Sequence, residues 1–107
     1  MEISKSDWKF YREKIGVWQE SYMEKLNNEY IYLLSATDKK ASDKFWALEK
    51  RIKNDRRHSG VIIEMRKSNA IYDMVSLVRL GVITCEDLTD FSEDLQQAVK
   101  YMVERFE

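Results

Sequence analysis

The sequence predicts an all-α fold, a four-helix bundle-like single domain over residues 1–107, from three observations. Proline is absent and glycine occurs only three times, so few positions interrupt a helix. Apolar residues recur at steps of three and four along most of the chain, which is the helical period. They make up 44% of the residues against 35% charged residues, a balance typical of a globular domain. We expect helices over about 6–34, 41–57, 62–80 and 85–106.

The first predicted helix, residues 6–34, is the longest and carries seven of the thirteen aromatic side chains. Unbroken, it would be about 44 Å long, which exceeds the size of a compact domain of this length. Either it kinks near Gly16 or Asn27–Asn28, or its end projects and needs a partner, and we favour the second. Its apolar stripe comprises Trp8, Tyr11, Ile15, Trp18, Tyr22, Leu26, Tyr30 and Leu33. The candidate self-association stripe within it comprises Trp8, Tyr11, Trp18 and Tyr22.

A second helix over 41–57 is expected to turn one apolar stripe toward the core: Ala41, Phe45, Leu48 and Ile52. On a neighbouring stripe, basic side chains flank an aromatic ring, and further cations follow in the next helix. Such a ring can stack a nucleic-acid base while the cations hold phosphates. The alternative is that the long cations only pack along the ring. The candidate surface for nucleic acid or an acidic partner comprises Trp46, Lys50, Lys53, Arg57, Arg66 and Lys67.

The third predicted helix, residues 62–80, is the most apolar segment and should be central. Its inward residues are expected to be Ile71, Met74, Val75 and Val78. The preceding corner contains Gly60, which suits a helix stop. The corner and this helix are loosely similar to a helix-turn-helix that enters a major groove. The length of the helices and the position of Glu64 weigh against that interpretation.

A tight corner is predicted between the third and fourth helices. Gly81 can take the left-handed conformation that ends a helix. Thr84 and Asp87 can form a capping box, and Leu88 stands at the spacing of a hydrophobic staple. After this corner, apolar residues stay on one helical face over five turns, which predicts a single helix over 85–106. These residues are Leu88, Phe91, Leu95, Val99, Met102 and Phe106. A break at Ser92, which could cap a new helix, is the alternative.

Charge is strongly segregated although the formal net charge is only −1. Residues 38–67 contain ten Lys and Arg against five Asp and Glu, whereas residues 84–107 contain two against seven. The two regions could attract each other within the fold or between subunits, or present separate faces to partners. The candidate acidic interaction patch comprises Glu86, Asp87, Asp90, Glu93 and Asp94.

We expect no catalytic, cofactor-binding or metal-ligating set in this sequence. His58 is the only histidine and has no ligand partner at a suitable spacing. Cys85 is the only cysteine, so it cannot form an internal disulfide, which suits a cytoplasmic protein. No apolar run approaches the ~18 residues that span a bilayer, so no membrane role is expected.

The run LVRLGVITCEDLTDF resembles the helical hairpin of the short bacterial C-terminal domains called SHOCT, whose corner carries a similar Gly-Ile-Ile-Thr-x-Glu-Glu pattern. This local resemblance concerns residues 71–91. More broadly, the chain from Lys44 onward is similar to small uncharacterised helical proteins of Gram-positive bacteria and their mobile elements. The resemblance implies a bacterial cytoplasmic protein, and it implies no residue-level function.

These observations lead to a functional expectation with one alternative. We expect a non-catalytic protein-interaction or regulatory module that associates with itself, as a homodimer, or with a host protein. A special case is a phage or mobile-element inhibitor of a host nuclease, as anti-CRISPR proteins are, with the acidic patch occupying a nucleic-acid groove. The alternative is a nucleic-acid-binding accessory protein that uses the basic second and third helices. An enzyme is not expected.

Overall fold

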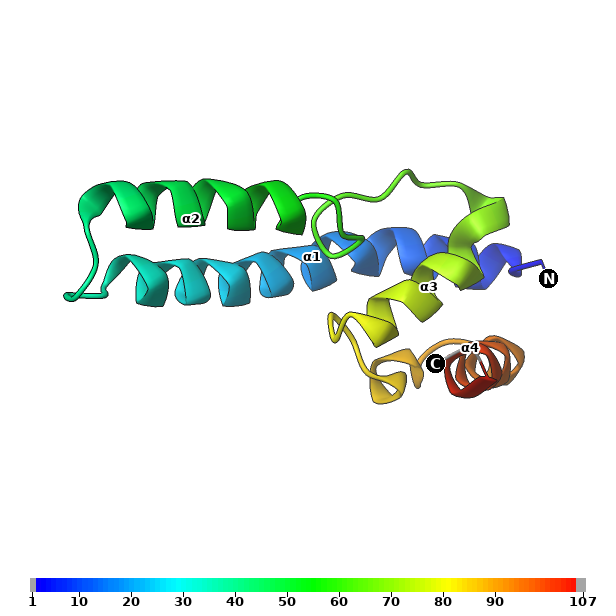
Figure 1. The fold of residues 1–107 in the computed structure, drawn as a ribbon. Helices are drawn as coiled ribbons and strands as arrows, with labels where there is room; N and C mark the ends of the chain where they lie inside the picture. Colours follow the sequence, from blue (N-terminus) through cyan, green and yellow to red (C-terminus); the bar gives the residue numbers. More distant parts are fainter. Residues whose placement is uncertain (1, 106–107) are drawn as a thin grey trace.

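The computed structural model describes residues 2–105 and is all-α, which confirms the predicted fold class (Figure 1). Four α-helices and two short 3₁₀ helices follow one another along the described residues. They are α1 (Lys5–Leu34), α2 (Ala41–Asp55), η1 (Lys67–Asn69), α3 (Ala70–Arg79), η2 (Cys85–Leu88) and α4 (Glu93–Arg105). The molecule is elongated, with principal extents of 51, 26 and 20 Å.

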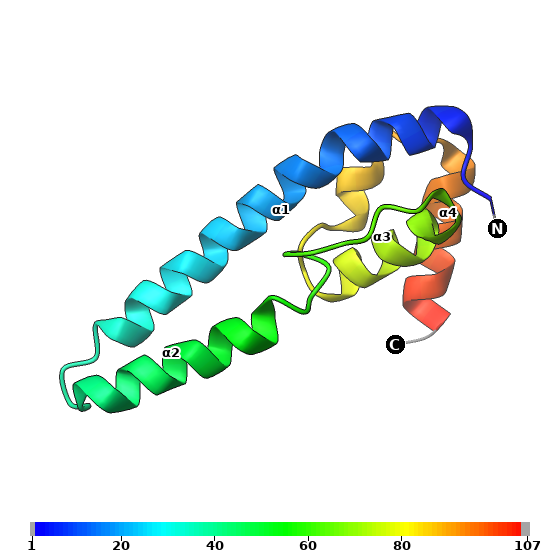
Figure 2. The same cartoon turned by 90° about the horizontal axis from the view of Figure 1, so that it is seen from above.

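Helix α1 is continuous over its whole length, so the predicted alternative of a kink at Gly16 or Asn27–Asn28 is wrong. The Ser4 side chain caps it by accepting a hydrogen bond from the backbone N–H of Asp7 at 3.1 Å. The second half of α1 projects beyond the core, as expected. The neighbour of this projecting half is α2, which runs back beside it as an antiparallel helix (Figures 1 and 2). We call residues 26–55 the distal hairpin.

The hydrophobic core lies at the other end of the molecule, where α3 and α4 pack against the first half of α1 (Figure 2). Tyr11 and Ile15 supply the α1 side of this core. Fully buried side chains from the other elements include Met74, Leu77, Leu88 and Val99. Predicted inward positions 71, 74 and 75 are buried, and Val78 packs against the cluster. The first half of α1 together with α3, η2 and α4 thus forms a compact base from which the distal hairpin extends.

The prediction of a helix over 62–80 is wrong in its first half. Residues 62–66 form no helix, and α3 starts only at Ala70 after the short turn η1. Val61, Ile62 and Ile63 are β-branched, which lowers helix propensity. Ile62 is 66% exposed whereas Ile63 packs against the core, the alternation of an extended chain.

The single helix predicted over 85–106 is also wrong, and the alternative break at Ser92 is confirmed. The segment consists of η2 followed by α4, and position 106 lies outside the described residues. The Ser92 hydroxyl accepts from the backbone N–H of Leu95, and its carbonyl accepts from Gln96, which starts α4. Asp7 of α1 accepts hydrogen bonds from Ser92 in turn, so the break is held from the opposite end of the chain.

The corner after α3 follows the prediction in detail. Gly81 has φ +75°, and the N–H of Val82 bonds to the carbonyl of Leu77 as in a Schellman motif. The Asp87 carboxylate accepts from the backbone N–H of Thr84 at 2.7 Å, and a capping box is present. Ile83 and Leu88, at the staple positions, are both buried. This chemistry starts η2 and does not start a long helix.

Candidate functional site

The face that α2 turns toward α1 differs from the prediction. Ala41, Phe45 and Ile52 were expected inside, but all three are exposed, and only Leu48 of that stripe is half-buried. The side chains that face α1 are Lys44, Leu48, Arg51 and Asp55. Three of these four are charged. The helix is thus rotated from the expected orientation, so that its apolar stripe lies at the edge of the contact with α1 and is open to solvent.

A polar cluster holds the two helices of the distal hairpin together. Asp55 is only 9% exposed. Its carboxylate accepts a 2.5 Å hydrogen bond from the Tyr30 hydroxyl and forms an ion pair with Arg51 at 3.1 Å. Arg51 also reaches Glu29 at 2.7 Å and lies over the Tyr30 ring. Burial and the hydrogen bond to Asp55 raise the pKa of Tyr30 to about 12. These bonds fix the rotation of α2 about its axis.

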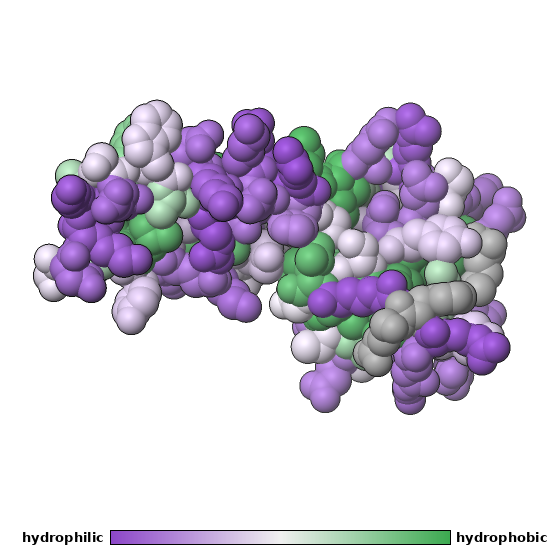
Figure 3. Space-filling view, viewed as in Figure 1, coloured by the Kyte–Doolittle hydropathy of each residue, from purple (hydrophilic) through white to green (hydrophobic). Residues whose placement is uncertain are grey.

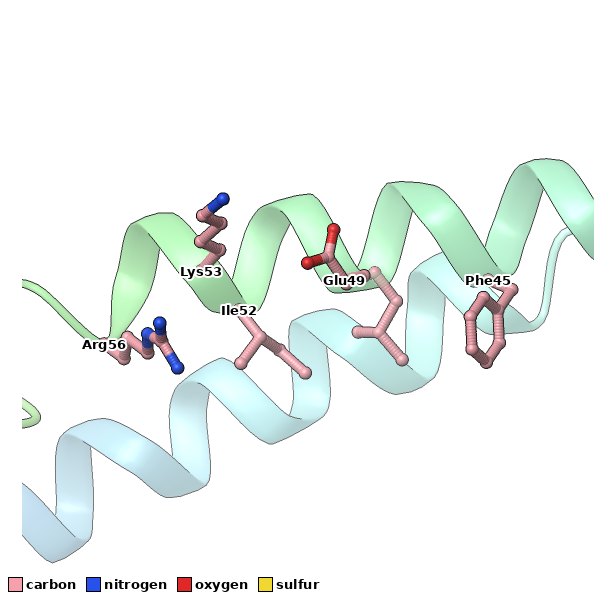
Figure 4. A pocket seen from close by; sticks show the side chains of 6 residues that line it. Phe45, Glu49, Ile52, Lys53 and Arg56 are labelled. Carbon is pink, nitrogen blue, oxygen red and sulfur yellow. The ribbon is translucent and has the colours of Figure 1, made fainter.

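The consequence is an open apolar groove along the exposed flank of α2 that borders α1. Phe45 is 62% exposed and Ile52 42%, and they stand seven residues apart, two turns of helix. Figure 4 shows both side chains extending toward the α1 side, with Lys53 extending away from it. We call this hollow of about 470 Å³ the α2 groove. Its lining comprises Phe45, Leu48, Glu49, Ile52, Lys53 and Arg56.

The α2 groove continues into a second hollow of about 280 Å³ between the two helices of the hairpin. The two share Ile52 and Arg56, so they form one surface. Met23 and Leu26 line the second hollow from α1. Hydrophobic residues therefore reach the surface of the distal hairpin among hydrophilic ones, as the space-filling view shows for one face (Figure 3).

The rim of the α2 groove is predominantly basic. Within residues 2–105, Lys53 and Arg56 form no ion pair, whereas Arg51 is neutralised by Glu29 and Asp55. Glu49 is the single acidic side chain of the lining. Because the charges at the rim face solvent, their field is available to a partner.

The predicted basic surface is divided between two parts of the molecule. Trp46, Lys50 and Lys53 lie exposed on α2, and Arg57 lies exposed in the turn that follows it. The Trp46 ring packs edge-on against Phe45 with 5.0 Å between centroids. Arg66 instead pairs with Glu64 at 2.7 Å in the extended segment before η1, where Lys67 follows. The structure thus keeps the α2 members together and places the other two on a separate element.

The predicted acidic patch is exposed around η2 and the start of α4. Asp87 is engaged in the capping box, so its carboxylate has a structural role. Glu86, Asp90, Glu93 and Asp94 form no ion pair within the described residues. The apolar neighbours of the patch, Leu88, Phe91 and Leu95, are buried in the core and give it no exposed apolar stripe.

The predicted self-association stripe is corrected by the structure. Tyr11 is fully buried, and Trp8 and Trp18 pack against the same intramolecular core. Tyr22 covers Gly60, where an added Cβ would meet its ring. These rings are therefore used within one chain. The exposed apolar side chains of α1 lie elsewhere, at Val17, Ile31, Tyr32 and Leu34.

The remaining titratable groups give no catalytic constellation in the part of the chain that is described. No group of three or more His, Cys, Asp or Glu there could hold a metal ion. Cys85 is exposed, and the carbonyl of His58 accepts from Val61 and Ile62 in the corner. In the core, burial raises the pKa of Asp73 to about 6. Burial, and secondarily the Asp73 carboxylate, raise the pKa of Tyr11 far above its usual range.

Two features of the site were missed by the sequence reasoning. Arg51 and Asp55 stand at the i, i+4 spacing of a helical ion pair, but such pairs are common on exposed helix surfaces, so the spacing did not indicate that this face turns toward α1. Glu49 and Arg56 were not included among the candidate surface residues, although they share the α2 face of Phe45 and Ile52.

No family model, curated protein or solved structure matches this chain. Among the described residues, no helix combines the length and the apolar character needed to cross a membrane.

Proposed function

We propose that the protein is a non-catalytic protein-interaction module and that the distal hairpin is its docking element. The observation that carries the proposal is the exposed apolar stripe of α2, where Phe45 and Ile52 are open to solvent while a polar cluster joins α2 to α1. Exposed apolar patches rimmed by polar residues are typical of protein interaction sites. A bacterial, cytoplasmic setting and a mobile-element origin remain predictions from the resemblance.

An affinity capture with matched baits tests this proposal. Tagged wild-type chain, a Phe45→Asp/Ile52→Asp variant and a Val17→Asp control would be used with a lysate of the source organism. Val17 is 65% exposed on α1, so the control adds the same kind of charge away from the α2 groove. We expect a protein retained by wild type and by the control and lost with the double variant. Equal capture by all three baits, or no capture, would count against the proposal.

Self-association through this surface is a second form of the proposal, and light scattering measures it directly. A homodimer built on the distal hairpin should dissociate in Phe45→Asp/Ile52→Asp and persist in Val17→Asp. The expected inhibition of a host nuclease is a separate form of the interaction function, because it would use a surface other than the distal hairpin. It would rest on the exposed carboxylates of Glu86, Asp90, Glu93 and Asp94.

Nucleic-acid binding is the second candidate function, favoured by the exposed Trp46, Lys50 and Lys53 of α2 and by Arg57 in the turn after it. Fluorescence anisotropy with labelled duplex DNA and single-stranded RNA tests it. Binding through phosphates should weaken steeply with added salt and be lost in Lys53→Glu/Arg57→Glu. Absence of binding to either probe at about 50 mM salt would exclude this function, since electrostatic binding is strongest at low salt.

A further inference from the structure

The α2 groove is long enough to accommodate one helix. From Phe45 to Arg56 it follows α2 for about 16 Å, roughly three turns. Phe45 and Ile52 are two turns apart on the same stripe, with Leu48 between them. An amphipathic helix presents apolar side chains at i, i+3, i+4 and i+7, the same spacing as these anchors.

The charges around the groove determine which kind of partner helix is electrostatically complementary to it. Lys53 and Arg56 on the rim form no ion pair in the described residues, and Lys50 and Arg57 add positive charge on the neighbouring stripe. Against these stands Glu49 alone in the lining. A helix flanked by carboxylates is therefore complementary, whereas a basic helix is repelled.

A second copy of this chain fits the groove poorly. Two copies related by a two-fold axis would present the same patch to each other, so two predominantly basic rims would meet. The acidic patch of another copy offers carboxylates, but its apolar neighbours Leu88, Phe91 and Leu95 are buried in the core. That patch therefore has no apolar stripe to place over Phe45 and Ile52.

We infer that the α2 groove binds an amphipathic helix of another protein whose apolar stripe packs on Phe45, Leu48 and Ile52 and whose flanking Asp or Glu residues pair with Lys53 and Arg56. This inference rests on the proposed interaction function and specifies the class of partner. Arg51 is excluded from recognition because Glu29 and Asp55 already neutralise it.

A displayed library of amphipathic helical peptides tests the inference. Each peptide carries a Leu, Ile or Phe stripe, and its flanks are varied among Glu, Gln and Lys; the full chain is the bait. Wild-type chain should enrich Glu-flanked peptides, and Lys53→Glu/Arg56→Glu should enrich Lys-flanked ones. An enriched peptide should lose at least about tenfold in affinity, or 1.4 kcal/mol, with Ile52→Asp. It should bind the Val17→Asp control as it binds wild type.

Each contrary outcome has a distinct meaning. The acidic-helix inference would be overturned if peptides were enriched regardless of the charge of their flanks. It would also be overturned if a peptide still bound Ile52→Asp while the circular dichroism of that variant showed unchanged helix content. Neither result would contradict the proposed interaction function. A homodimer that dissociates in Ile52→Asp, with no peptide enriched, would replace the inferred partner with a second copy. No enriched peptide, together with no groove-dependent capture from lysate and a monomeric chain, would overturn both proposals.

Discussion

The carboxylate of Asp7, in the first turn of α1, accepts hydrogen bonds from Ser92, 85 positions later in the chain. One oxygen takes the Ser92 backbone N–H at 3.0 Å and the other takes its hydroxyl at 2.5 Å. Asp7 is only 5% exposed. Because Ser92 caps α4, this pair connects the start of one helix to the start of another and closes the core between them.

Loss of the Asp7 carboxylate should destabilise the whole base of the molecule. Asp7→Ala leaves the N–H and hydroxyl of Ser92 without this acceptor, which should cost about 2–3 kcal/mol in free energy of unfolding. Glu13→Ala, at an exposed site on the same helix, should change it by less than about 0.5 kcal/mol. Urea unfolding followed by circular dichroism measures both. Equal stability of the two variants would contradict the role given to this pair.

Gly60 should be intolerant of any side chain, for a steric reason. An added Cβ would meet the Tyr22 ring and lie 2.7 Å from a methyl carbon of Val82. We expect Gly60→Ala to cost about 1–3 kcal/mol through overpacking. Gly16, in α1, has nothing within 4 Å of an added Cβ, so Gly16→Ala should gain up to about 1 kcal/mol from helix propensity. Thermal unfolding should give shifts of opposite sign, and shifts of the same sign would refute this explanation.

Asp73 should make stability depend on pH between about 4 and 6. Its pKa is raised by burial from 3.8 to about 6, so in this window the folded state binds more protons than the unfolded state. The contribution of Asp73 to the free energy of unfolding is therefore fully present below about pH 4, and it is lost as the pH rises through 6.

Asp73→Asn tests this linkage because it removes the buried charge at all pH values. Relative to wild type, it should gain about 1–2 kcal/mol at pH 7, a figure reduced for partial exposure of the side chain. The gain should vanish near pH 4. Urea unfolding of both chains at the two pH values measures it. Asp90→Asn, at an exposed site, is the control for removing one carboxylate. An equal difference for Asp73→Asn at both pH values would rule the linkage out.

Local chemistry made some of this fold predictable from sequence. Gly81 needs its left-handed conformation whatever surrounds it, and Thr84 with Asp87 needs only four residues to form a capping box. The length of α1 followed from a periodicity that extends over many turns.

Other features depended on contacts between segments far apart in sequence, and these were not predictable from local pattern. The sequence allowed either one continuous helix or a break at Ser92, because the residue that stabilises the break, Asp7, belongs to another helix. The rotation of α2 depends on Tyr30 and Glu29 of α1, which pair with Asp55 and Arg51. An apolar stripe alone could not indicate that polar contacts would occupy the inward face.

The most direct test of an open α2 groove is the stability cost of truncating Phe45 compared with that of a core residue. If Phe45 serves recognition, Phe45→Ala should change the free energy of unfolding by less than about 1 kcal/mol, because the side chain is 62% exposed. Leu77→Ala, at a fully buried site, should cost about 2–5 kcal/mol. A loss for Phe45→Ala as large as that for Leu77→Ala would show that Phe45 holds the fold together and would contradict its assignment to a docking surface.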